Sequence, residues 1–118
     1  MSKYDKDLIK AYNFGNYSRT IKNQIDLIKL KMKKKLQFSI HGGSFELTSD
    51  FIVYVKSYAD QGVYRAIFLD QFENPVQVDN VEEFYDKVHS IRRNVLNEFY
   101  EEFEKLRKTR NLTDMLDE

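Results

Sequence analysis

The sequence predicts a single α+β domain, and two observations carry this prediction. Apolar spacing switches from helical to alternating at residue 36, and two turn-like segments, Gly42-Gly43 and residues 70–75, each join stretches typical of strands. The 118 residues, with one Pro and four Gly, suit one core and no linker. We divide the domain, residues 1–118, into four segments: a basic helical segment (1–35), a hairpin-helix-hairpin segment (36–79), a long helix (80–110) and an acidic tail (111–118).

The N-terminal segment is predicted to be helical, with a break at Gly15-Asn16. After the break, apolar residues recur every three or four positions, which is the spacing of one helix face. This stripe consists of Tyr17, Ile21, Ile25, Ile28 and Met32. Ser18 is available as an N-cap, and the helix is expected to end near Lys34. Leu27 and Leu30 lie off the stripe, so this helix has a wide apolar face or covers a second surface.

A β-hairpin is predicted to follow the first helix. Its turn is Gly42-Gly43, because glycine takes the positive φ that both central positions of such a turn require. This turn sets a register in which apolar side chains face one another across the strands. The expected pairs are His41 with Ser44, Ile40 with Phe45, and Phe38 with Leu47.

A short helix and a second hairpin are predicted next. Thr48-Ser49-Asp50 supplies capping groups for a helix that ends at Gln61-Gly62. The run from Val63 to Leu69 is apolar on both faces, as in a strand that is covered on two sides. Turn-forming residues 70–75 lead into a strand at 76–78. We expect the two hairpins to build one small antiparallel sheet.

The last predicted element is a long helix from Val81 to about Arg110, which begins at a capping-box-like pair, Asn80 and Glu83. Its length is about 44 Å, against a radius of gyration near 13 Å for a ~100-residue globule. The helix must therefore protrude or contact a partner. Its apolar stripe leaves heptad spacing after Val95, which favours packing on another straight helix over a long coiled coil. We expect the first and last helices to pack on the sheet and partly on each other.

The charges cancel overall but are unevenly distributed. Residues 1–35 carry a net charge of +7, residues 36–80 carry −4 and residues 81–118 carry −3. This asymmetry indicates a nucleic-acid footprint, or two elements of one fold or oligomer that attract each other. The chain has no Cys, no apolar run near the ~18 residues that span a bilayer and no signal-peptide pattern, so we expect no membrane contact and a cytoplasmic location.

Catalysis and metal binding have no recognisable carrier in the sequence. His41 with the glycines after it resembles the oxyanion loops of esterases, but no nucleophile elbow accompanies it. His89 lacks a second histidine at metal-binding spacing, and Asp70, Glu73 and Asn74 lack the spacing of a calcium loop. We therefore predict no enzymatic activity, cofactor, metal or small-molecule substrate.

Large apolar side chains of the last helix are the first candidates for a protein interface, because aromatic residues dominate contact energies. These residues are Tyr85, Leu96, Phe99, Tyr100 and Phe103. The densest basic run is the second candidate site: Lys29, Lys31, Lys33, Lys34 and Lys35. This run is a solvated face, a nucleic-acid contact or a contact to an acidic protein surface, in the same chain or in a neighbouring copy. The acidic residues near the end of the last helix are candidates for that surface: Glu98, Glu101, Glu102 and Glu104.

The acidic tail is the third candidate. It is either a frayed terminus or a docking peptide whose apolar anchors are flanked by acids. The anchors are Leu112, Met115 and Leu116. The tail is similar to the tails by which phage replication and transcription factors bind sliding clamps.

The stretches FSIHGGSFELTSDFIVYVKSYADQG and FLDQFENPVQVDNVEEF resemble small proteins of contractile-tailed bacteriophages, in particular those of cyanobacterial hosts. The resemblance covers about residues 36–110 and implies a viral protein in the host cytoplasm or the virion. We therefore expect a non-enzymatic interaction or assembly protein, a homo-oligomer or bound to another protein, that uses its last helix. The alternatives are a nucleic-acid-binding accessory factor and docking through the tail.

Overall fold

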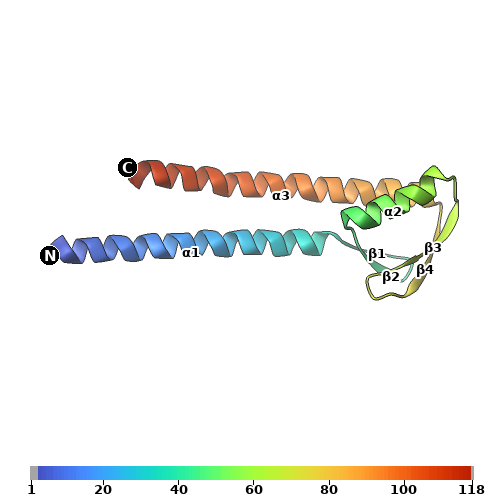
Figure 1. The fold of residues 1–118 in the computed structure, drawn as a ribbon, viewed down its shortest axis with the longest axis horizontal. Helices are drawn as coiled ribbons and strands as arrows, with labels where there is room; N and C mark the ends of the chain where they lie inside the picture. Colours follow the sequence, from blue (N-terminus) through green and yellow to red (C-terminus); the bar gives the residue numbers. More distant parts are fainter. Residues whose placement is uncertain (1–2, 118) are drawn as a thin grey trace.

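A computed structural model describes the backbone of residues 3–117 and the side chains of residues 19–109. The predicted order of elements is confirmed, with three helices and two antiparallel hairpins (Figure 1). The elements are α1 (Lys3–Lys35), β1 (Gln37–Ile40), β2 (Gly43–Glu46), α2 (Ser49–Asp60), β3 (Arg65–Leu69), β4 (Pro75–Asp79) and α3 (Val81–Asp117).

The molecule is elongated, with principal extents of 75 × 25 × 16 Å and a radius of gyration of 22.1 Å. Helices α1 and α3 lie side by side and are antiparallel. Both extend to the same side of the hairpins and α2, so the two ends of the chain lie at the same end of the molecule (Figure 1). We call residues 19–35 of α1 and 96–109 of α3 the arm, and residues 36–95 the head. The prediction that the last helix protrudes and packs on another straight helix is confirmed, because α3 packs along α1.

Both long helices extend further than the sequence patterns predicted. The backbone of α1 is helical from Lys3 onward, without the expected break at Gly15-Asn16, and α3 continues past Arg110 to Asp117. A glycine within a helix costs about 1 kcal/mol relative to alanine, which does not suffice to end it.

The predicted helix caps are present. The side chain of Thr48 accepts a hydrogen bond of 3.1 Å from the backbone N–H of Phe51, and the cap of α3 is built by Asn80, which accepts from the backbone N–H of Glu83 at 3.2 Å.

The two hairpins form separate two-stranded sheets, so the expected single sheet was wrong. The register of the first hairpin was also wrong: Phe38 pairs with Phe45 and Ile40 with Gly43. Its turn is formed by His41 (φ 53°) and Gly42 (φ 79°) rather than by two glycines. Gly43 lies in β2 instead, where a Cβ would collide with the side chain of Val76. The second glycine therefore serves packing between the hairpins, and the two-residue slip keeps the same side chains facing inward.

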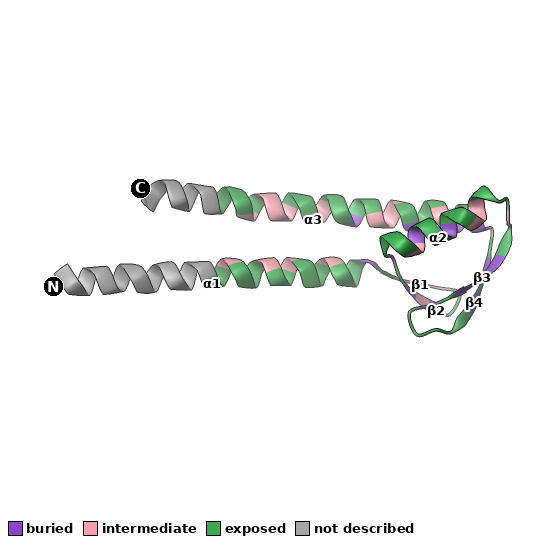
Figure 2. Cartoon of the chain, in the orientation of Figure 1, coloured by how far each residue is buried: buried purple, intermediate pink, exposed green. Residues whose placement is uncertain are grey.

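The core lies in the head, between the inner faces of the hairpins, α2 and the first four turns of α3 (Figure 2). Four phenylalanine rings form its centre, with Phe45, Phe51, Phe68 and Phe84 in contact at centroid distances of 5.4–6.3 Å. The most deeply buried side chains are Phe45, Leu47, Val55, Phe68, Val78, Val81 and Val88.

Strand β3 is covered on one face only, which corrects the expectation that both faces would be covered. Ala66 and Phe68 point into the core, whereas Ile67 and Leu69 are 55% and 61% exposed. Because both faces of β3 are apolar, the face that carries Ile67 and Leu69 forms an exposed apolar surface on the head. Neither α1 nor α3, over the part that the structure describes, has a stretch apolar enough to cross a membrane.

Candidate protein-protein contact surfaces

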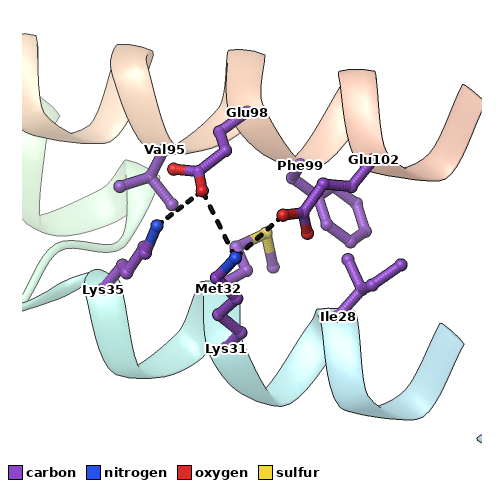
Figure 3. Close-up of a pocket in the computed structure, with 8 residues that line it drawn as sticks. All are labelled: Ile28, Lys31, Met32, Lys35, Val95, Glu98, Phe99 and Glu102. Atoms are coloured by element: carbon purple, nitrogen blue, oxygen red, sulfur yellow. Dashed lines mark hydrogen bonds and ion pairs between the residues drawn. The ribbon is translucent and has the colours of Figure 1, made fainter. Parts of the chain in front are cut away.

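The two helices of the arm meet along an apolar seam. Ile28 and Met32 of α1 lie opposite Val95 and Phe99 of α3 (Figure 3). Val95 is buried, whereas Phe99, Ile28 and Met32 are only partly covered. No side chain of the arm, over residues 19–35 and 96–109, is fully buried (Figure 2). Two helices alone thus leave the seam open along much of its length.

Ion pairs between α1 and α3 lie beside this seam. Lys35 Nζ lies 2.6 Å from Glu98 Oε1, and Lys31 Nζ lies 2.8 Å from Glu102 Oε1 and 3.5 Å from Glu98 Oε1 (Figure 3). The hydrogen bond from Lys35 is the main cause that lowers the pKa of Glu98, and the bond to Glu102 is the main cause that raises the pKa of Lys31. For these two lysines, the acidic surface is that of the same chain.

The other three lysines of the basic run, Lys29, Lys33 and Lys34, are exposed. Among residues 19–109, no carboxylate lies within ion-pair distance of their amines. The predicted run is therefore split into two lysines that join the helices of the arm and three that face solvent.

The predicted interface residues of α3 fall into two groups. The first group is partly buried and consists of Tyr85, Phe99 and Phe103. The ring of Tyr85 stacks on that of His89 with a centroid distance of 5.4 Å, and the rings of Phe99 and Phe103 have centroids 6.0 Å apart. Leu96 and Tyr100 are 38% and 65% exposed. These two are therefore the more accessible of the predicted interface residues.

A groove lies between α2 and α3, next to Leu96, and has a volume of about 370 Å³. We call it the α2–α3 groove. Its apolar lining residues are Ile52, Val53 and Leu96, and no carboxylate lines it. Its basic side is held in place because Arg92 Nη1 donates a hydrogen bond of 2.7 Å to the carbonyl of Leu47. The full lining is Ser49, Ile52, Val53, His89, Arg92, Arg93, Leu96 and Asn97.

Sequence reasoning missed a second exposed apolar surface, on the outer side of the β3–β4 hairpin. Four large apolar residues there, Tyr64, Ile67, Leu69 and Phe72, are 55–68% exposed. The signal was present in the apolar run from Val63 to Leu69, which was interpreted as a fully covered strand. Arg65 and Asp79 close one end of this surface, with a cross-strand ion pair of 2.6 Å.

The two hairpins are joined by Asp70, which is 8% exposed. Its carboxylate accepts hydrogen bonds from the backbone N–H groups of Asn74 and Phe72, both at 2.9 Å, and of Ser44 at 3.2 Å. The pKa of Asp70 is lowered chiefly by the Asn74 bond and further by the bonds from Ser44 and Phe72, while burial opposes the shift. Asp70 therefore acts as a structural link between the two hairpins.

The residues weighed for catalysis are not brought together. His41 lies in the β1–β2 turn, whereas His89 is an exposed residue of α3. Within the described part of the chain, no group of three or more His, Cys, Asp or Glu side chains is placed to hold a metal ion. The predicted docking anchors Leu112, Met115 and Leu116 lie outside the described side chains.

No protein-family model, curated protein or solved structure matches this chain.

Proposed function

We propose that the protein is a non-catalytic interaction or assembly protein that acts through contacts of α3, with a second copy of the chain as its partner. The observation that carries this proposal is the open arm. Its helices have apolar side chains along their contact, yet none of residues 19–35 and 96–109 is fully buried. Two-helix units of this kind reach full burial when further helices complete a bundle.

Leu96 and Tyr100 support α3 as the contacting element. They are exposed on the side of α3 that faces away from the ion pairs of the arm, next to the partly covered Phe99 and Phe103. Tyrosine is enriched among the residues that contribute most to interface energies, which supports Tyr100 in particular. The viral origin implied by the resemblance to phage proteins stays a prediction, and the proposed self-association does not depend on it.

Light scattering on the purified full chain over a wide concentration range tests the proposal. We expect an oligomer in the wild type, and a shift to the monomer when Leu96→Glu and Tyr100→Glu are combined, because both charges would be buried in the contact. Phe72→Glu is the matched control, since Phe72 is 68% exposed on the head. A wild type that stays monomeric at every concentration contradicts the proposal.

A second candidate function is nucleic-acid binding, and the exposed Lys29, Lys33 and Lys34 favour it. These lysines pair with no carboxylate among residues 19–109 and are available to neutralise phosphates, so affinity must fall as the salt concentration rises. Binding of single- and double-stranded DNA and RNA at two salt concentrations tests this function. Binding that is absent at low salt, or unchanged when the three lysines become glutamines, excludes it.

A further inference from the structure

The α2–α3 groove has a chemistry that specifies its ligand. Its lining includes the apolar Ile52, Val53 and Leu96, and Val53 is 66% exposed. Arg92 and Arg93 also line it and no carboxylate does, so the groove carries a net positive charge. A segment with apolar anchors between acidic residues matches both features, as in other grooves that bind short acidic peptides.

The chain itself contains such a segment. Residues 111–118 read NLTDMLDE, in which acidic residues flank the apolar pair Met115 and Leu116, and Leu112 lies two positions before Asp114. The acids of this tail are Asp114, Asp117 and Glu118, and it has no basic residue. Tail and groove are therefore complementary in charge and in apolar character.

The tail cannot reach the groove of its own chain. Helix α3 is continuous from Val81 to Asp117, so Met115 lies 19 residues beyond Leu96, or about 28 Å along the helix axis. A tail that occupies this groove must therefore come from another copy.

We propose that residues 111–118 of one copy dock in the α2–α3 groove of a second copy, within a symmetric dimer of antiparallel α3 helices. This inference rests on the proposed function, since it names the contact by which two copies would associate. In a two-fold symmetric dimer the contact between tail and groove occurs twice, so one complementary pair contributes twice to the free energy of association.

The alignment that places Met115 of one copy beside Leu96 of the other also pairs opposite charges along α3. In that register, Arg93 lies opposite Glu118, and two further acid–base pairs follow from the sequence alone. These pairs are Glu101 with Arg110 and Glu104 with Arg107. The sequence of α3 is therefore self-complementary in the antiparallel direction at this register.

Charge exchange tests the contact in the full-length chain. Arg93→Glu in the groove, or Asp117→Arg with Glu118→Arg in the tail, places like charges together and should weaken the dimer by about ten-fold or more in dissociation constant. An equimolar mixture of these two variants should form mixed dimers again, because the new glutamate then meets the new arginines. Sedimentation or light scattering measures both effects.

Lys56→Glu and Asp60→Arg are matched controls, since both side chains are exposed on α2 and neither lines the groove. They should leave the dimer unchanged. If the dimer survives both charge-reversed variants but is lost with Leu96→Glu and Tyr100→Glu, the docking inference is wrong while the proposed function stands. Variants that weaken the dimer but are not rescued by mixing also overturn the inference, and a wild-type monomer overturns both.

A disulfide provides an independent measurement, because the natural chain has no cysteine. The double variant Leu96→Cys with Met115→Cys should form a covalent dimer on mild oxidation, since bonded cysteines need Cα atoms within about 7 Å. The helix prevents the same bond within one chain. Leu30→Cys with Met115→Cys is the control, as Leu30 is 50% exposed but lies outside the groove. Absence of a covalent dimer, or equal yields from both pairs, contradicts the docking.

Discussion

The carboxylate of Asp70 accepts a hydrogen bond of 3.2 Å from the backbone N–H of Ser44, and this contact links two hairpins that share no strand pairing. The backbone N–H of Gln71 reinforces the link, with a hydrogen bond of 2.8 Å to the carbonyl of Ser44. These hydrogen bonds act together with the packing of Val76 on Gly43 to position the two hairpins relative to each other.

We predict that Asp70→Asn destabilises the head, since an amide presents a donor where the carboxylate accepted three backbone N–H bonds. The loss should depend on pH. A lowered folded pKa contributes stability that is present above the unfolded value of about 4 and is lost as the pH falls through the folded pKa. Urea unfolding of both proteins from pH 7 to pH 2 measures this. A difference between them that does not shrink below about pH 4 would contradict the prediction.

Gly43→Ala should destabilise the protein by about 1–3 kcal/mol, as expected for an overpacked contact. The added methyl group would collide with Val76, where the two hairpins meet. Gly42→Asn is the matched control, because Gly42 has open space around it and asparagine tolerates its positive φ of 79°. Thermal unfolding of both variants should show a loss for the Gly43 variant only. Equal losses would mean that the turn, rather than packing, requires Gly43.

Phe68→Ala should cost about 3–5 kcal/mol in unfolding free energy, because it leaves a cavity at the centre of the aromatic cluster. Phe68 is 1% exposed and contacts Phe51, Tyr54, Tyr58 and Phe84. The same substitution at the exposed Phe72 should change stability by no more than about 0.5 kcal/mol. Chemical denaturation distinguishes the two, and a loss below about 1 kcal/mol for Phe68→Ala would show that the core is not organised around this ring.

Glu98→Gln should loosen the arm, since Glu98 pairs with both Lys31 and Lys35. These side chains are partly exposed, so the effect should be modest: amide hydrogen exchange in residues 28–35 should rise roughly two- to five-fold at low salt and less at high salt. Glu82→Gln provides the control, because Glu82 is exposed on α3 and forms none of these interhelical pairs. An equal rise in both variants would mean that the ion pairs do not hold the helices together.

Local patterns predicted the order of elements, the caps at Thr48 and Asn80 and the inward face of the first hairpin, because each depends on a few neighbouring residues. They did not predict the register around Gly43, since the space available there is set by Val76 from a different hairpin. The exposed face of β3 was misinterpreted for a related reason. An apolar run such as that of residues 63–69 indicates that burial of both strand faces is favourable. It cannot show whether other residues of the same chain bury them.

For the candidate surfaces, the charge asymmetry left open a nucleic-acid footprint or an attraction between two elements, and the structure shows which lysines pair with α3. Lys31 and Lys35 lie on the side of α1 that faces Glu98 and Glu102, whereas Lys29, Lys33 and Lys34 do not. Spacing along one helix could not separate them, because the direction of α3 relative to α1 was unknown. The α2–α3 groove was unpredictable for the same reason, as its lining comes from two helices whose packing angle no local pattern specifies.

The antiparallel arrangement of the arm also determines how the molecule would respond to mechanical load. A force that separates residues 19 and 109 acts across the two helices, so it opens the arm like a zipper, one turn at a time. The Lys31–Glu102 pair would break before the Lys35–Glu98 pair, and the phenylalanine core would be loaded last. Unzipping ruptures contacts in sequence rather than together, so the arm should open at low force while the head stays folded.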